Sequence, residues 1–282
     1  MSRAITLTLP EVQLMFHVKH QPEQESQSNT MFHVKHDEKE STAPAEFCNA
    51  NQSTTAQTML LLAGGRAPAK TWLQSLGKDF PVYCADKGAS YALEAGLSPA
   101  LVVGDGDSAA HAIYEHAHKL GAKLDIHPPA KDDTDLQLLL EQLPQGNLIA
   151  TGIWGGRFDH LYSNVYSLLA HKEKQGSQVV LADDKELLVL LTAAESVEVS
   201  LTSLSSVQAI SLLPLAASST VSIAGVRWPL QETELTQQRP YAISNEPLGS
   251  KLECTCHGGK IGLYFHWQVD ERKLKTTGNK LR

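Results

Sequence analysis

The chain of 282 residues is 42% hydrophobic and 20% charged, so it can bury the core of one large domain or two smaller ones. Its formal net charge of -7 argues against broad electrostatic attraction to nucleic acid or to an anionic membrane. No apolar run is long enough to span a membrane, Pro10 and Glu11 interrupt the N-terminal apolar stretch, and the four cysteines lack the spacing of a disulfide framework. We therefore expect a cytoplasmic protein that acts on small molecules, with neither nucleic acid nor membrane as a partner.

Residues 1–57 are expected to be a disordered or non-native extension. The sequence MFHVKH occurs at residues 15–20 and again at 31–36, and polar sequence then continues to Ser53, a composition that cannot build a core. The doubled His-x-x-His could chelate a metal, but no scaffold is expected to hold the imidazoles. One set of codons for MFHVKH is its own reverse complement, which favours a DNA-level origin for the repeat and no role in catalysis.

From Thr58 onward, apolar runs of strand length alternate with helix-like segments. The runs are TMLLLAGG, PVYCAD, LVVGD, KLDIHP, NLIATG and QVVLAD, and amphipathic stretches such as TDLQLLLEQL lie between them. Continuous apolar strands separated by helices are typical of βαβ units and of a parallel sheet covered on both faces. The pattern predicts a Rossmann-like α/β domain over residues 58–193.

The pattern changes at about Ser196, after which strand candidates follow one another without convincing helices. These candidates are SVEVSL, VQAISLLPL, STVSIAGVRWPL and KLECTCHGGKIGLYFHW. They predict an antiparallel β-sandwich domain over residues 194–270, followed by a polar tail at 271–282. Cys254, Cys256 and His257 could suggest zinc, but alternation puts both thiols on one strand face and a fourth ligand is missing, so we favour core packing.

Polar residues collect directly after the strands of the predicted α/β domain, at the sheet edge where such folds bind ligands. They are Asp86, Asp105, Asp107, the group KDDTD at 131–135 and the group GGRFDH at 155–160. Several carboxylates alongside basic groups suit a Mg²⁺-polyphosphate complex, because hard oxygen ligands hold the ion while the basic groups balance the phosphate charge. Ser108, Asp132 or Thr134 could instead be only a helix N-cap.

The segment GGRAPAKT at residues 64–71 follows the first strand and leaves two interpretations open. It matches the P-loop pattern G-x-x-x-x-G-K-S/T except that Ala69 occupies the second glycine position, and Pro68 removes a backbone N–H donor. We favour a strand-to-helix turn in which Gly64 and Gly65 allow close approach of a ligand.

Several of these motifs, taken in order, resemble the thiamine pyrophosphokinase family over about residues 59–267. They are ADKGA, GLSPALVVGDGDS, KDDTDLQLLL, GGRFDHLYSN, GVRWPL and the pair Ser244-Asn245. The resemblance implies a nucleotide-binding α/β domain joined to a β-sandwich, and a homodimer in which the β domain of one subunit completes the site of the other. It implies transfer of the pyrophosphoryl group of ATP to the hydroxyl of thiamine, with release of AMP. Lys87 departs from the family, which usually has a small residue there.

The resemblance also implies roles for individual residues. Metal ligation falls to Asp105, Asp107 and Asp132. Catalytic roles fall to Asp107, Asp132, Asp135, Arg157 and Asp159, with Asp135 chosen as acceptor of the hydroxyl proton. Substrate-binding roles fall to Asp86, Lys131, Thr134, His160, Asn164, Trp228, Ser244 and Asn245.

Alternatives remain open for one residue and for the function. Trp228 could be a core aromatic that closes a strand, or its indole could stack on the cationic thiazolium of thiamine. The chain could also be another Mg²⁺-dependent pyrophosphoryl or nucleotide-sugar transferase, or a thiamine sensor without catalytic activity.

Overall fold

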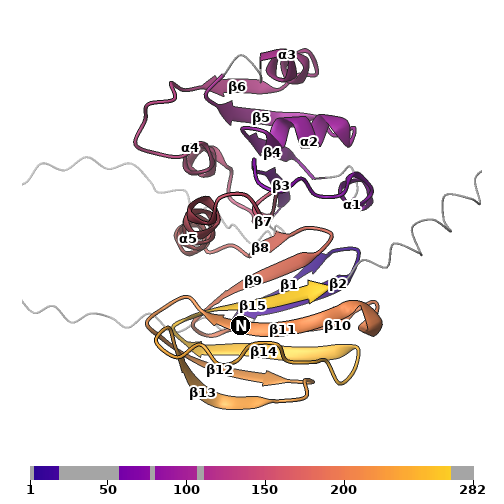
Figure 1. Cartoon of the computed structure of the whole chain (residues 1–282), viewed down its shortest axis with the longest axis vertical. Helices are drawn as coiled ribbons and strands as arrows, with labels where there is room; N and C mark the ends of the chain where they lie inside the picture. Colours follow the sequence, from indigo (N-terminus) through magenta and orange to yellow (C-terminus); the bar gives the residue numbers. More distant parts are fainter. Residues whose placement is uncertain (1–2, 19–56, 77–79, 107–110, 268–282) are drawn as a thin grey trace, which may run out of the picture.

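The computed structural model describes residues 3–18, 57–76, 80–106 and 111–267, with an α/β part above a β-sandwich in the view of Figure 1. The α/β part alternates strands and helices in the predicted order. Its elements are β3 (Thr58–Leu62), α1 (Lys70–Ser75), β4 (Val82–Ala85), α2 (Gly88–Glu94), β5 (Pro99–Gly104), α3 (His111–Lys119), β6 (Lys123–Ile126), α4 (Asp135–Gln142), β7 (Asn147–Thr151), α5 (Phe158–Gln175) and β8 (Val179–Ala182). No helix in these described ranges is long and apolar enough to cross a membrane.

The remaining strands form the sandwich. They are β9 (Glu186–Thr192), β10 (Glu195–Leu201), β11 (Val207–Pro214), β12 (Ser218–Ala224), β13 (Leu230–Thr236), β14 (Lys251–Gly258) and β15 (Lys260–Trp267), with a short 3-10 helix, η1 (Leu204–Ser206), before β11. The fold class predicted from the sequence, a mostly parallel α/β part followed by an antiparallel β-sandwich, is confirmed.

A single nine-stranded sheet runs through both parts of the molecule, in the order β11-β15-β9-β8-β7-β3-β4-β5-β6. Strands β3 to β8 pair in parallel, and the sheet turns antiparallel where β8 pairs with β9. One layer of the sandwich is therefore an extension of the parallel sheet. The α/β part and the sandwich share backbone hydrogen bonds as well as a core.

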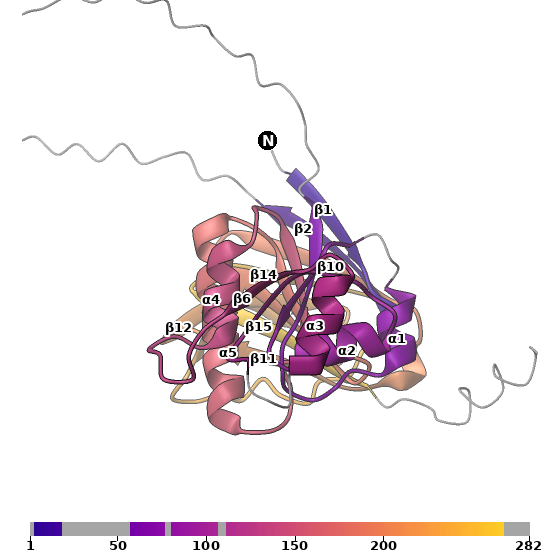
Figure 2. The same cartoon turned by 90° about the horizontal axis from the view of Figure 1, so that it is seen from above.

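Alternation along β3 explains how both faces of this sheet are covered. Leu60 and Leu62 pack into the cluster that includes Trp72 and Leu73 of α1, while Met59 and Leu61 pack with Leu139 of α4 and Leu168 of α5. Figure 2 shows α1, α2 and α3 on one side of the sheet and α4 and α5 on the other. A continuous apolar strand is thus required because neither face meets water.

The N-terminal segment corrects the sequence analysis. Residues 3–18 form a hairpin of β1 (Arg3–Thr8) and β2 (Val12–Val18), and β2 pairs with β10 in a six-stranded sheet ordered β1-β2-β10-β14-β12-β13. Leu14 and Phe16 are fully buried in the sandwich core. The disorder expected within the extension of residues 1–57 is therefore contradicted for residues 3–18, which form paired strands.

The physical reason lies in the alternation of β2. Apolar residues at every second position point into the core, and Gln13 between them is exposed. Pro10 and Glu11, which interrupt the apolar stretch, form the turn, because Leu9 and Val12 exchange backbone hydrogen bonds at 2.8 and 3.2 Å. The first MFHVKH copy begins inside β2, and the second copy lies outside the described residues.

The two thiols of the C-x-C-H segment pack in the core, as the sequence analysis expected. Cys254 and Cys256 are buried and free on β14, whereas His257 is exposed and hydrogen-bonds to Ser222 at 2.8 Å. The thiols therefore belong to the sandwich core, and the zinc interpretation is not supported.

Candidate active site

The strand order reverses between β3 and β7, the position at which open α/β sheets bind ligands. From β3 the chain adds β4, β5 and β6 on one side of the sheet, and then returns through α4 to place β7 and β8 on the other side. Because these strands are parallel, the loops that follow them lie at one edge. The polar residues singled out in the sequence are carried by those loops.

Three carboxylates and one lysine come together at this edge. Asp86 follows β4, Asp105 follows β5, and Asp135 is the first residue of α4. Asp86 is hydrogen-bonded to Asp135 and lies within electrostatic reach of Asp105. Lys131 donates a hydrogen bond of 2.5 Å from Nζ to Oδ1 of Asp135. The structure therefore joins residues from three separate motifs into one acidic group with a cation beside it.

Asp86 has a pKa well above that of an exposed aspartate. Burial first, and then the nearby carboxylates of Asp135 and Asp105, raise its pKa to about 7. Its backbone has a φ of 51°, a left-handed conformation that costs a non-glycine residue energy and that is common at functional sites. Carboxylate oxygens are ligands that divalent cations prefer, and a cation would offset the repulsion that Asp86 experiences from Asp135 and Asp105, so the group suits a divalent metal bound with phosphate.

The KDDTD group divides into residues that face the site and residues that support the helix. Thr134 is the N-cap of α4: its hydroxyl accepts a hydrogen bond from the Gln137 N–H, and the Gln137 side chain accepts one from the Thr134 N–H. Asp132 is exposed. The substrate-binding role given to Thr134 and the catalytic and metal-binding roles given to Asp132 stay predictions.

The structure describes two of the three metal ligands predicted from the sequence, Asp105 and Asp132. Asp107 lies outside the described residues. Among the residues that the structure describes, no three His, Cys, Asp or Glu side chains form a preformed metal site. Asp105 is half-buried directly after β5 and interacts electrostatically with the Asp86 carboxylate.

The GGRFDH group places Arg157 and Asp159 at the start of α5. The guanidinium of Arg157 pairs with Asp159 through Nε at 3.1 Å and through a second hydrogen bond, which lowers the pKa of Asp159. Both side chains are exposed, as is His160, while Asn164 is half-buried one turn further along. The arrangement leaves Arg157 accessible to an anion.

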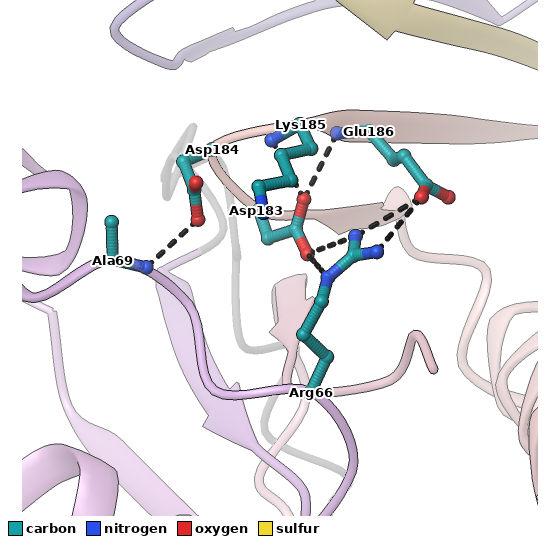
Figure 3. Close-up of polar contacts among 6 residues, drawn as sticks. All are labelled: Arg66, Ala69, Asp183, Asp184, Lys185 and Glu186. Atoms are coloured by element: carbon teal, nitrogen blue, oxygen red, sulfur yellow. Dashed lines mark hydrogen bonds and ion pairs between the residues drawn. The ribbon is translucent and has the colours of Figure 1, made fainter. Parts of the chain in front are cut away.

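The P-loop interpretation of residues 64–71 is not supported. The backbone N–H groups of Gly65 and Arg66 donate to the carbonyls of Gly152 and Trp154, and the Ala69 N–H donates to Oδ1 of Asp184 at 2.8 Å (Figure 3). A P-loop holds phosphate with such N–H groups, so these donors are already used. The segment is a strand-to-helix turn.

A concave site lies in the sandwich. It is a pocket of about 250 Å³ lined by Ile210, Leu212, Ile223, Trp228, Leu230, Tyr241, Ala242, Ile243 and Asn245. Trp228 is 53% exposed, so it is not a core residue. The guanidinium of Arg227 lies 4.9 Å from its ring centroid, which means that a cation already occupies one face of the indole.

Asn245 holds the Trp228 segment in place. Its Nδ2 donates to the Trp228 carbonyl at 2.8 Å, and its Oδ1 accepts from the N–H groups of Trp228 and Glu246 at 3.1 and 2.9 Å. Ser244 is exposed with a φ of 61°, and its N–H donates to the hydroxyl of Ser211. The sequence analysis missed Tyr241 and Ile243, although two large apolar residues in a polar loop are a recognisable signal.

The sequence matches two family descriptions that divide at the same point as the fold. Residues 74–181 match the catalytic domain of thiamin pyrophosphokinase, and residues 197–259 match its vitamin B1 binding domain. Together these segments cover more than half of the chain. The chain belongs to the thiamine pyrophosphokinase family. It is therefore an enzyme of the transferase class, a kinase of thiamine diphosphate biosynthesis.

Individual relatives have low sequence identity to this chain. A thiamine pyrophosphokinase of Bacillus subtilis is 29% identical over 171 residues, which are 59% of this chain and 78% of that protein. Thiamine pyrophosphokinase 1 of Arabidopsis thaliana is 27% identical over 147 residues, 49% of this chain and 54% of that protein.

Solved structures resemble the fold. The crystal structure of the Bacillus subtilis protein superposes with a TM-score of 0.64 at 24% identity, over 76% of this chain and 100% of that one. Yeast thiamin pyrophosphokinase gives a TM-score of 0.62 at 16% identity, over 78% and 89% of the two chains. Two segments lie outside both matched family segments: the hairpin of residues 3–18, and the loop of residues 63–69 between β3 and α1, called the β3 loop below, which carries Arg66.

Proposed function

We propose that the protein transfers the pyrophosphoryl group of ATP to the hydroxyl of thiamine, giving thiamine diphosphate and AMP, with Mg²⁺ held by the acidic edge of the sheet. The observation that carries the proposal is the acidic group of Asp86, Asp105 and Asp135, with Lys131 beside it, in the segment that matches the family's catalytic domain. Membership of the family supports the same reaction.

Asp105, Asp107 and Asp132 are the residues that we propose to hold Mg²⁺. The ion neutralises charge on the phosphoryl oxygens when it is bound. Lys131 and Arg157 supply fixed positive charge beside the same oxygens, and Asp159 orients the Arg157 guanidinium through the hydrogen bonds described above. Asp86, Thr134, His160 and Asn164 are proposed to contact ATP.

A proton must leave the thiamine hydroxyl as the new P–O bond forms. We propose that Asp135 accepts it, because the hydrogen bond from Lys131 fixes the orientation of this carboxylate at the sheet edge. Asp135 is hydrogen-bonded to Asp86, whose pKa is raised to about 7, so the proposed base is one member of a carboxyl pair.

Thiamine is proposed to bind in the sandwich pocket. An exposed indole next to apolar side chains suits a flat ring that carries a positive charge. Asn245 lines the pocket and Ser244 precedes it in the chain, and we propose that this pair orients the aminopyrimidine. Because the indole face already lies over Arg227, binding requires the ligand to use the other face or to displace the guanidinium.

We propose a homodimer in which each site is shared between subunits. Large apolar side chains are exposed in two places, at Phe158 and Tyr162 of α5 and at Tyr241, Ile243 and Leu248 in the loop before β14. Phe158 and Tyr162 continue into the half-buried Tyr166 through ring contacts along the helix. Gln237 contacts the hydroxyl of Tyr166 at 3.4 Å, which joins α5 to the sandwich. Apolar patches of this kind commonly mark protein interfaces.

Calorimetry with thiamine alone, followed by detection of AMP after addition of ATP and Mg²⁺, tests the activity. Thiamine-dependent release of AMP is expected. Thiamine binding without AMP would indicate a sensor, and AMP release with a different acceptor would indicate another transferase.

Mixing two impaired variants, assayed at a thiamine concentration near the wild-type KM, tests the shared site. If each site combines the α/β part of one subunit with the sandwich of the other, a heterodimer of Asp105→Asn and Trp228→Ala contains one intact site. Activity should therefore rise on mixing above that of either variant alone. Heterodimers that are shown to form but are no more active than the separate variants would contradict a shared site.

We further propose that the protein works in the cytoplasm, in a reducing environment. Cys84, Cys254 and Cys256 are free thiols in the core, as expected where disulfides do not form.

A further inference from the structure

Arg66 makes four charged hydrogen bonds, and no role was assigned to it from the sequence. Its Nε and Nη2 donate to Oδ2 of Asp183 at 3.0 and 2.6 Å, and its Nη1 and Nη2 donate to Oε1 of Glu186 at 3.0 and 3.1 Å (Figure 3). Asp183 is fully buried, and its other oxygen accepts from the N–H groups of Lys185 and Glu186. Arg66 thus fastens the β3 loop to the β8–β9 turn.

The β3 loop is also hydrogen-bonded to the loop of residues 152–157 between β7 and α5, called the β7 loop below. Gly65 and Arg66 donate backbone hydrogen bonds to the carbonyls of Gly152 and Trp154 at 2.7 and 2.5 Å. The contact is so close that a Cβ at Gly65 would lie 2.5 Å from the Gly152 oxygen, and a Cβ at Gly155 would lie 3.1 Å from the Arg66 Cβ. These two loops cannot shift independently.

The β7 loop leads directly into the start of α5. Arg157 follows Gly155 and Gly156, two glycines with φ of 70° that leave this stretch of backbone with little intrinsic stiffness. Both Arg157 and Asp159 are exposed, and their side chains pair with each other at the start of the helix. Their position relative to the acidic group therefore depends on what holds the β7 loop.

We propose that Arg66 is a positioning residue, which fixes the β7 loop and hence Arg157 and Asp159 by clamping the β3 loop to the β8–β9 turn. This proposal rests on the proposed function for its effect on catalysis. The planar guanidinium binds both carboxylates at once, which a lysine cannot do with the same geometry. Misplacement of a charged group by about 1 Å can lower a rate by about a hundredfold, so a loosened clamp is expected to reduce kcat.

The test uses the double variant Arg66→Met/Asp183→Asn. It removes the clamp without leaving a buried unpaired carboxylate, and the asparagine keeps an oxygen for the N–H groups of Lys185 and Glu186. We expect kcat to fall about tenfold to a hundredfold while the KM for thiamine changes less than about twofold. Arg66→Lys, which retains the charge but not the fork, should lie between wild type and the double variant.

Hydrogen exchange supplies a readout that does not depend on activity. Amides of residues 63–66 and 152–157 should exchange at least about tenfold faster in the double variant, because their mutual hydrogen bonds lose support. Val199→Ala is the matched control: Val199 is buried in β10, away from these loops, so this variant lowers stability and should leave both kcat and the exchange of these loops unchanged.

Unchanged kcat and unchanged loop exchange in the double variant would overturn the proposal. So would an equal loss of kcat in Val199→Ala at the same melting temperature, since that loss would reflect stability alone. If the wild type releases no AMP with thiamine, the proposed function fails, and the exchange rates still decide whether Arg66 holds the β7 loop.

Discussion

The indole Nε1 of Trp72 in α1 donates a hydrogen bond to Oε2 of Glu11 in the β1–β2 turn, at 3.2 Å. Burial of Glu11 beside Asp183 and Asp184 raises its pKa, so the turn lies against the same β8–β9 connection that Arg66 holds. The Thr202 hydroxyl also donates to the Glu11 carbonyl at 2.8 Å. The N-terminal hairpin is therefore attached to both parts of the molecule.

Removal of a single buried side chain tests whether the hairpin belongs to the fold. Phe16→Ala should lower the free energy of unfolding by about 3–5 kcal/mol, because Phe16 is fully buried opposite Val197. The second MFHVKH copy offers a matched control, for which the sequence predicts no structural role, so Phe32→Ala should leave stability unchanged. Denaturant unfolding followed by fluorescence measures both. Equal stability of all three proteins would contradict the placement of β2.

The raised pKa of Asp86 makes stability depend on pH in the metal-free protein. In the native state Asp86 holds its proton up to about pH 7, whereas in the unfolded chain it loses that proton near the ordinary aspartate pKa of 3.8. The contribution of protonated Asp86 to the free energy of unfolding is therefore complete below about pH 3.8 and is lost as the pH rises through 7. Asp86→Asn, which cannot ionise, should raise the melting temperature more at pH 8 than at pH 5 in the presence of a chelator.

Asp132→Asn is the control for this experiment because Asp132 is exposed in the same acidic region. It should retain the pH dependence of the wild type. An Asp86→Asn protein whose melting temperature follows the wild type at both pH values would show that Asp86 is not protonated in the native state.

Loss of a proposed metal ligand should affect activity and not the fold. Asp105→Asn keeps the shape of the side chain but removes the charge, and activity should fall at least about a hundredfold if bound metal contributes several kcal/mol to the transition state. Asp133→Asn makes the same change at an exposed position with no proposed role. Turnover at several Mg²⁺ concentrations and melting temperature are measured together. Comparable turnover in both variants would remove Asp105 from the proposed ligand set.

Trp228→Ala should separate thiamine from ATP. Stacking and cation–π attraction are worth about 2 kcal/mol in a desolvated pocket, so the KM for thiamine should rise about thirtyfold while that for ATP stays nearly constant. Because Trp228 is exposed, the melting temperature should change little. Trp72→Ala is the contrasting variant, since Trp72 is buried and its loss should lower stability without a preference between substrates. An unchanged KM for thiamine in Trp228→Ala would exclude the indole from the acceptor site.

The sequence by itself determined the order and class of the elements. Apolar runs such as TMLLL and NLIAT became β3 and β7, buried on both faces, and the carboxylates after the strands lie at one sheet edge. Thr134 was recognised as a possible N-cap and is one. These features depend on the local period of hydrophobic residues and on local capping, which a short window of sequence contains in full.

Only the tertiary structure decided which distant segments meet. The pairing of β2 with β10 made strands of residues 3–18, although their alternation was visible in the sequence, and the pairing of β8 with β9 merged two predicted sheets into one. The contact of Asp86 with Asp135, the exposure of Trp228 and the clamp of Arg66 on Asp183 likewise join or expose residues far apart in the chain. Such relationships follow from how whole faces pack and from which strand edges remain to be covered, and no local pattern encodes that choice.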